Sequence, residues 1–349
     1  MQRVLAFATL AVAVLVGGCA DVPRRETPVA PVAAPDVPPP PDEPVLARDR
    51  EFAVVSVQPG EDFARLAERW LGDRSLRNRI AEFNGIDEAR AGQVIAIPLK
   101  SPNAFGVTAN AVQAVTILCY HRFGSRAGPL TVTPASFEAQ MNYLARNGYH
   151  VIPIARLASF LEGRESLPQK SVVVTIDDGY RSMFEIAYPV LRRHRFPATV
   201  FLYTDFVGAP DALTWPQMKE MVASGLIEVQ PHSKTHANLT LRLHDESEAR
   251  YRDRARREVD FPSELIRSQL GTPVHAFAFP YGDVNDTVMN ELRAKGIKLG
   301  VTVTPGGNPF YAPPFMLRRT MIFGGDDLDA FRAKLQASIP LGRQAVASQ

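Results

Sequence analysis

The sequence is poor in cysteine: Cys19 and Cys119 are the only two among its 349 residues. This count gives no sign of the disulfide framework on which small secreted domains depend. If Cys19 is lipidated at the end of an N-terminal signal, as expected below, Cys119 is left alone. Cys119 alternates with Ile117 and His121 in an expected strand, so we expect a small buried apolar residue there and not a catalytic thiol.

Signatures of nucleotide and nucleic-acid binding are also missing. The chain has no phosphate loop, no dinucleotide-binding fingerprint and no internal repeat. Its formal net charge is only +2. The one charge-rich stretch, residues 242–257, mixes acids with bases, as a solvated helix face does. We therefore expect no nucleic-acid partner.

Residues 1–19 have the pattern of an export signal. Arg3 supplies a short positive region, and residues 4–16 form an apolar run too short to span a membrane. The end of this run, Val-Gly-Gly-Cys, resembles a bacterial lipobox, which implies that Cys19 is lipidated and anchors the protein. By resemblance to Gram-negative sorting rules, Ala20 implies the outer membrane, with the protein facing the periplasm. The alternative is an ordinary secretory signal with a chance cysteine.

Two linkers divide the rest of the chain. Residues 20–50 are rich in proline, which predicts an extended polyproline tether without a core. Residues 101–112 form a second, shorter linker. The domains expected between and after them are a small unit at 51–100 and a larger one at 113–340.

The small unit has apolar spacing that predicts a strand, two helices and a second strand. This order, with the segments VQPGEDFARLAERWLGD, IAEFNGI and AGQVIAIP, resembles the LysM domain, a small α+β fold. The resemblance implies binding to the N-acetylglucosamine backbone of peptidoglycan or chitin. It places the candidate glycan contacts in the two strand–helix loops, at Gly60, Glu61, Asp62 and at 84–87, beginning with Asn84. Trp70 is expected in the core.

The larger unit is organised around TIDDG, residues 175–179. Three valines precede it, as in a buried parallel strand, and an expected helix at 180–194 follows. Carboxylates at the tip of such a strand lie where α/β folds keep their active sites. Gly179 allows the backbone to bend so that Asp177 and Asp178 can face one cavity. Strands and helices alternate through the rest of the unit, which predicts a mostly parallel sheet, and an incomplete barrel over an open sheet.

His232 and His236, in HSKTH, follow another expected strand. With Asp178 they would make three protein ligands and leave a position open, the pattern of a catalytic zinc site. Other transition metals are possible. Asp177 is placed to act as the general base, and His121, at the end of the first strand of the unit, is the candidate general acid.

The motifs TIDDG, HSKTH and FAFPYG together resemble those of the NodB-like polysaccharide deacetylases, carbohydrate esterase family 4. The resemblance covers about residues 113–338 and implies an incomplete, distorted (β/α)7 barrel. It implies that Asp177 is the base, that Asp178, His232 and His236 bind the metal, and that the backbone N–H of Tyr281 helps to stabilise the oxyanion.

Two features depart from the family pattern. The arginine usual in the third motif is missing, and Arg318 or Arg319 is expected to replace it. No histidine follows His275, whereas the family usually takes its acid from near the C-terminus. The segment ILCYHRF, residues 117–123, instead resembles a permuted branch that includes the biofilm poly-N-acetylglucosamine deacetylases. That resemblance implies His121 as the acid.

The expected function is metal-dependent removal of acetyl groups from N-acetylglucosamine in a cell-envelope polysaccharide. The LysM-like unit favours peptidoglycan as substrate or docking surface, and the permuted motif favours a secreted polymer. The alternatives are an inactive peptidoglycan-binding lipoprotein and a glycosidase. A glycosidase needs carboxylates about 5–9.5 Å apart across the bond, which adjacent residues serve poorly.

Overall fold

The structure is a computed structural model that describes residues 45–100, 103, 105–108 and 110–341. The predicted signal, Cys19 and most of the proline-rich tether lie outside the described residues. Within the described part of the chain, no helix combines the length and the apolar character needed to cross a membrane.

The small unit forms an antiparallel sheet of β1 (Val45–Arg48), β2 (Phe52–Ser56) and β3 (Val94–Pro98), in that order. Helices α1 (Phe63–Leu71) and α2 (Arg77–Asn84) cover it, joined by a short 3₁₀ turn, η1 (Arg74–Leu76). Asp62 caps α1 by accepting a hydrogen bond from the backbone N–H of Arg65, and Gly72 ends the helix in the left-handed conformation. Trp70 is buried in the core, as predicted. The strand–helix–helix–strand order is therefore present, with β1 added from residues expected in the tether.

The candidate glycan contacts of the small unit already have partners within it. Glu61 pairs with Arg69 at 2.6 Å and accepts a hydrogen bond from the backbone of Gln58. The side chain of Asn84 joins α2 to β3, because it donates to the carbonyl oxygen of Ala96 and accepts from the backbone N–H of the same residue. Asp62 is the cap described above, and Gly60 has a φ of 83°. Binding of glycan by these residues remains a prediction.

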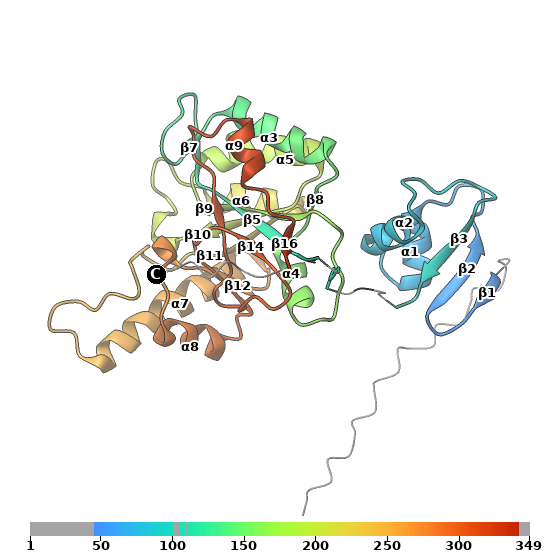
Figure 1. Ribbon diagram of the computed structural model, residues 1–349. Helices are drawn as coiled ribbons and strands as arrows, with labels where there is room; N and C mark the ends of the chain where they lie inside the picture. Colours follow the sequence, from blue (N-terminus) through green and yellow to red (C-terminus); the bar gives the residue numbers. More distant parts are fainter. Residues whose placement is uncertain (1–44, 101–102, 104, 109, 342–349) are drawn as a thin grey trace, which may run out of the picture. The chain divides into compact units, whose positions relative to one another are not determined.

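The core of the larger unit is a mainly parallel sheet (Figure 1). Its main path runs β11 (Ile227–Pro231), β10 (Ala198–Leu202), β9 (Ser171–Asp178), β5 (Val115–Tyr120) and β14 (Gly307–Asn308). Strands β8 (His150–Val151) and β15 (Thr320–Met321) pair with β9 and β5 in parallel, and only β14 is antiparallel. Every residue of β5, β9 and β10 is buried, as expected for strands covered on both faces. The predicted mostly parallel sheet is confirmed.

Beyond β11 two more parallel strands follow, but no continuous backbone hydrogen bonding joins them to the main sheet. Strands β12 (Ala276–Ala278) and β13 (Leu299–Val301) pair only with each other. Gln230 bridges the gap, because its side-chain carbonyl accepts hydrogen bonds from the backbone of His275 at 3.0 Å and of Ala276 at 3.1 Å. A single bridge, Val301 to Leu317, continues the arrangement past β13. This α/β arrangement is consistent with the expected incomplete, barrel-like domain.

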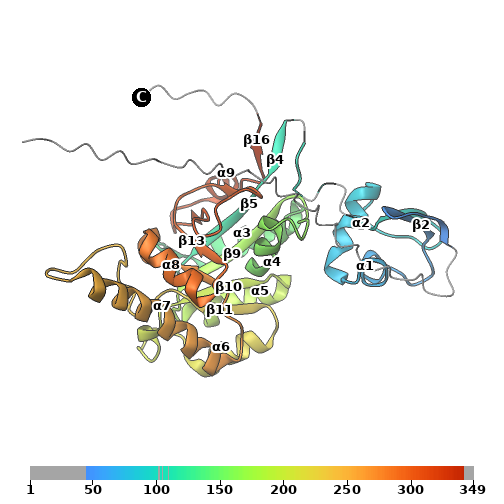
Figure 2. The same cartoon turned by 90° about the horizontal axis from the view of Figure 1, so that it is seen from below.

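Helices surround this sheet. In Figure 1, α3, α5 and α9 lie on one side of the strands, and α7 and α8 lie together on the other; Figure 2 shows α5, α6, α7 and α8 outside β9, β10 and β11. The helices are α3 (Pro134–Arg146), α4 (Ile154–Leu161), α5 (Tyr188–His194), α6 (Trp215–Ala223), α7 (Glu248–Leu270), α8 (Asp286–Lys295) and α9 (Leu328–Ala333). Most begin at capping residues: Thr133, Thr214, Ser247, Asn285 and Asp327.

Three expectations from the sequence differ from the structure. The helix expected from Tyr180 begins with a π-helical turn, η2 (Met183–Ala187), before α5. The helix expected to reach residue 338 ends at Ala333, and β16 (Ser338–Pro340) pairs with β4 (Ala111–Gln113). Residues 111 and 112 therefore belong to a strand and not to a linker. This two-stranded ribbon joins segments over two hundred residues apart, which no local pattern signals.

Candidate active site

The site lies at the carboxyl end of β9, where the two adjacent aspartates separate. Asp177 lies in the strand and is 1% exposed. Asp178 adopts a φ of 73° and Gly179 a φ of 87°, so the chain turns sharply. A β-carbon at Gly179 would lie 2.4 Å from Cδ1 of Leu202, and L side chains rarely adopt a φ of 87°, so both observations favour glycine here. The bend predicted at Gly179 thus starts one residue earlier, at Asp178.

Asp178, His232 and His236 form a group whose ligand atoms lie within 4.8 Å of one another. Nε2 of His236 is 3.3 Å, and Nε2 of His232 is 3.7 Å, from Oδ1 of Asp178. With zinc–nitrogen distances of about 2.0–2.1 Å and zinc–oxygen distances of about 2.0–2.2 Å, tetrahedral ligands lie about 3.3–3.5 Å apart. Oδ1 of Asp178 is buried without a hydrogen-bond partner. Because a buried oxygen without a partner is costly, these three residues fit a divalent cation.

The backbone after β11 presents the two imidazoles. Nδ1 of His232 donates a hydrogen bond to the carbonyl oxygen of Ala278, at 2.8 Å, which leaves Nε2 facing Asp178. Burial lowers the pKa of His232, which favours the neutral, ligating form. Ser233 and His236 both have positive φ. With Asp178 and Tyr281 they make four of the seven non-glycine residues with positive φ among those described, so this uncommon conformation gathers at the site.

Glu258, in the middle of α7, holds this loop from behind. It is 6% exposed, and its carboxylate accepts three hydrogen bonds of 2.9 Å: from the backbone of Lys234, from the backbone of Thr235 and from the hydroxyl of Thr235. These residues lie between the two histidines. The charged stretch interpreted as a solvated face, residues 242–257, ends one residue before Glu258, and Glu258 was not among the predicted site residues. The sequence feature that could have identified Glu258 is that an acidic residue lies on the apolar face of the helix, beside Tyr251, Ala255 and Val259.

Asp177 is held by Arg319, which resolves the choice left open between two arginines. Arg319 is fully buried and donates to both carboxylate oxygens of Asp177, at 2.6 and 2.8 Å. Arg318 is exposed. Burial acts to raise the pKa of Asp177, but the charge of Arg319, followed by that of His232, offsets it and holds this pKa well below its usual range. Asp177 is therefore ionised and fixed in position.

His121 and Cys119 lie beside Asp177. The thiol of Cys119 is 3.6 Å from Oδ2 of Asp177. A ring nitrogen of His121 lies within 4.8 Å of both groups. Cys119 is completely buried, as predicted, and burial raises the pKa of its thiol well above the usual value. The structure thus brings the expected acid next to the expected base.

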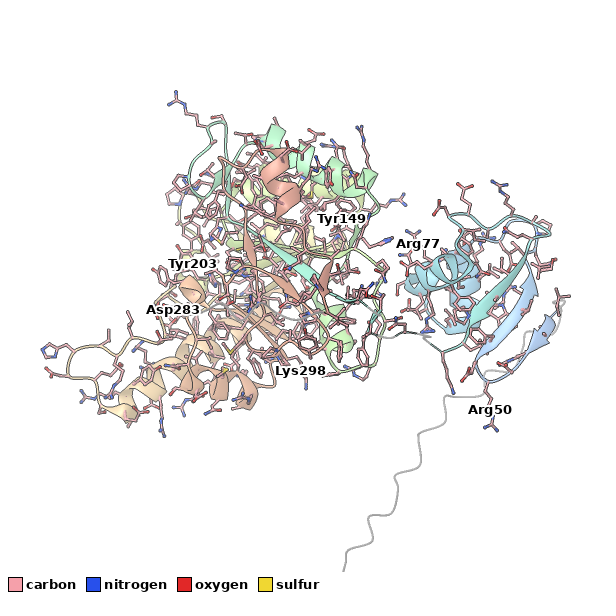
Figure 3. All side chains as sticks on the ribbon, in the orientation of Figure 1. Arg50, Arg77, Tyr149, Tyr203, Asp283 and Lys298 are labelled. Atoms are coloured by element: carbon pink, nitrogen blue, oxygen red, sulfur yellow. The ribbon has the colours of Figure 1, made fainter. Side chains whose placement is uncertain are left out.

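The turn at Tyr281 and the end of β10 border the histidines. Tyr281 has a φ of 62°, is 60% exposed, and its ring centroid lies 5.0 Å from that of His236. Tyr203, labelled in Figure 3, follows β10 with its ring centroid 5.1 Å from that of His236. Burial raises the pKa of Tyr203 to about 12, so this phenol is neutral. The motifs TIDDG, HSKTH and FAFPYG therefore each contribute residues to one site.

Comparison with known proteins agrees with this geometry. Residues 164–300 match the family model for polysaccharide deacetylase. The chain is 28% identical over 221 residues to a putative polysaccharide deacetylase, YxkH, of Bacillus subtilis, covering 63% of this chain and 76% of that protein. It is 28% identical over 211 residues to poly-beta-1,6-N-acetyl-D-glucosamine N-deacetylase of Escherichia coli, covering 51% of this chain and only 31% of that protein.

A solved structure is similar in the same region. The structure of IcaB from Ammonifex degensii superimposes with a TM-score of 0.56 at 28% identity, covering 63% of this chain and 94% of that one. The matched family segment contains TIDDG, HSKTH and FAFPYG, whereas His121 and Arg319 lie outside it. The chain therefore contains a domain that matches the polysaccharide deacetylases, hydrolases that act on carbon–nitrogen bonds.

Proposed function

We propose that this chain removes acetyl groups from N-acetylglucosamine residues of a cell-envelope polysaccharide, with a divalent ion, most suitably zinc, held by Asp178, His232 and His236. The observation that carries the proposal is the unpartnered buried oxygen of Asp178 facing two imidazole nitrogens. A divalent ion held there supplies Lewis acidity, which lowers the pKa of water and polarises a carbonyl.

The protein's own groups divide the proton transfers between them. Asp177 takes the proton of the attacking water, and its fixed carboxylate is held in place by Arg319. His121 gives a proton to the nitrogen that leaves. The backbone N–H of Tyr281 donates to the oxygen that gains negative charge. The side-by-side placement of His121 and Asp177 supports this division of labour.

We favour a poly-N-acetylglucosamine polymer as substrate, on the strength of the activity named for the relative from Escherichia coli. Peptidoglycan is the second candidate, favoured by the strand–helix–helix–strand unit, which we propose to be a LysM domain that docks the enzyme on the wall. Acetate release from β-1,6-linked and β-1,4-linked N-acetylglucosamine oligomers and from peptidoglycan, each with and without chelator, tests the proposal. Chain cleavage without acetate would indicate a glycosidase, and wall binding without acetate an inactive binding protein.

We also propose that Cys19 is lipidated and holds the protein at the outer membrane, facing the periplasm. The lipobox-like end of the signal supports this. Cys19→Ser is expected to leave the membrane fraction. A variant that still partitions with the membrane, together with a wild type that takes up no labelled lipid, would refute the anchor.

A further inference from the structure

A second group of potential metal ligands lies beside the first, made of Cys119, His121 and Asp177. Cys119 belongs to β5, His121 follows that strand directly, and Asp177 lies on the neighbouring parallel strand β9. One ligand atom from each lies within 4.8 Å of the others. A thiol, an imidazole and a carboxylate are all recognised ligands of zinc.

The sulfur–oxygen distance within this group is that of a thiol–carboxylate hydrogen bond, and it also suits two ligands of one ion. Zinc–sulfur distances are about 2.3 Å and zinc–oxygen distances about 2.0–2.2 Å, so tetrahedral ligands of these types lie about 3.5–3.7 Å apart. Sγ of Cys119 and Oδ2 of Asp177 are 3.6 Å apart. The strands therefore already hold sulfur and oxygen at the required separation.

The second observation concerns His121. Its Nδ1 is buried and has no hydrogen-bond partner. His121 itself is partly exposed, whereas Cys119 and Asp177 behind it are buried. The group therefore holds one unpartnered buried nitrogen and one side chain, that of His121, which is partly open to solvent.

We propose that Cys119, His121 and Asp177 form a second, inhibitory site for thiophilic divalent cations. On binding, the thiol of Cys119 loses its proton to solvent and with it its hydrogen bond to Oδ2 of Asp177. The sulfur, one imidazole nitrogen and Oδ2 bind the ion, while Arg319 keeps Oδ1 through Nη1 and shares Oδ2 with the ion through Nη2. Thiolate and carboxylate together outweigh the single positive charge of Arg319. A thiolate ligand selects zinc, cobalt or cadmium over magnesium or calcium.

Occupation of this site would stop the proposed reaction. The ion takes the oxygen of the base and a nitrogen of the acid, so neither group can carry a proton. Inhibition rests on the proposed function, but binding of the second ion does not. The deacetylase would therefore need one equivalent of metal and be inhibited by more.

Cobalt titration of the full chain, stripped of metal, tests the site. The first equivalent should bind without a sulfur-to-cobalt charge-transfer band. A second equivalent should produce that band and reduce acetate release. In Cys119→Ala the band should be absent, and inhibition, relative to the variant's own one-equivalent activity, should need at least about tenfold more metal, since loss of a ligand weakens the site. Cys119→Ser, which keeps a small polar group, provides a second variant if alanine destabilises the strand.

Several outcomes would overturn the proposal: saturation at one equivalent, a sulfur band already complete with the first equivalent, equal inhibition of Cys119→Ala and wild type, or equal inhibition by magnesium. A wild type that shows the second-equivalent sulfur band but releases no acetate from any sugar would instead refute the proposed function and leave the second site standing.

Discussion

Asp177 and Asp178 are adjacent and chemically identical, yet their carboxylates have different surroundings in the site. Asp177 has both oxygens bound by a buried arginine. Asp178, one residue later, has a buried oxygen with no partner. The difference arises because Asp177 has an extended backbone, while Asp178, the last residue of β9, has already turned into positive φ. A carboxylate bound on both oxygens by an arginine is fixed in position, whereas one with an unpartnered oxygen among imidazoles is suited to bind the first cation.

The largest expected effect separates the two aspartates directly. Asp177→Asn should keep its metal and lose about 10²–10⁴-fold in rate, as is typical when a general base is removed. Asp178→Asn should lose the metal, because two imidazoles remain. Elemental analysis paired with acetate release measures both effects. If Asp177→Asn loses the metal and Asp178→Asn retains it, their roles are reversed.

The next effect concerns stability on the base side. Arg319→Met leaves Asp177 buried and unpaired, which should cost about 3–5 kcal/mol in the free energy of unfolding. Because the folded-state pKa of Asp177 lies below its unfolded value of about 3.9, this contribution is fully present at pH 7 and is lost as the pH falls through the folded pKa.

In the variant, the pKa of Asp177 should rise, and the acid limb of the rate profile should move to higher pH. Urea unfolding and pH–rate profiles measure the two effects. Arg318→Met, at the exposed neighbouring position, is the matched control and should change neither. Equal losses in the two variants would show that the buried ion pair is not their cause.

A smaller effect concerns the ligand side. Glu258→Ala removes the acceptor of three hydrogen bonds from the loop between His232 and His236. We expect metal affinity to fall about 10–100-fold, as for other groups that orient metal ligands, with activity recovered at high metal concentration. Glu264→Ala, an exposed acid on the same helix, is the control. Metal affinity unchanged in Glu258→Ala would mean that the loop is held without it.

The smallest effect is expected from removing the small unit. It has a hydrophobic core of its own. Deletion of residues 45–100 should leave turnover of short soluble oligomers nearly unchanged and preserve the contrast between Asp177 and Asp178, while binding to insoluble wall polymer falls. Loss of soluble turnover comparable to the loss of wall binding would show that the catalytic region depends on this unit.

The sequence predicted the parts of the site that follow strands. Asp177, Asp178, His232 and His236 could be found because each lies at or just after the carboxyl end of a buried run, and such ends meet at one edge of a parallel sheet. Their positions in the structure follow from that local rule.

Other parts depend on contacts that no local pattern contains. Arg318 and Arg319 are adjacent and chemically identical, so the choice between them depends on which side chain faces the core. Strand β15, which follows them, has only two residues and so shows too little alternation to decide this. Strand β1 lay in a proline-rich stretch, and β16 lay where a helix pattern was expected to continue. Strand β16 is fixed by β4, more than two hundred residues away, whereas β1 is fixed by β2, which follows it directly.

The pairing of Asp177 with Arg319 also bears on how the protein is made. The two residues are 142 positions apart, so the carboxylate leaves the ribosome well before its partner. Strands β15 and β16, which pair with β5 and β4, emerge later still. Contacts between such distant segments form slowly, because the entropy of closing a long loop is lost before the contacts contribute any stabilising free energy. A nascent chain that ends before Arg319 would have to bury an unpaired charge, so the catalytic domain should complete its folding only after Arg319 and the strands that follow it have emerged.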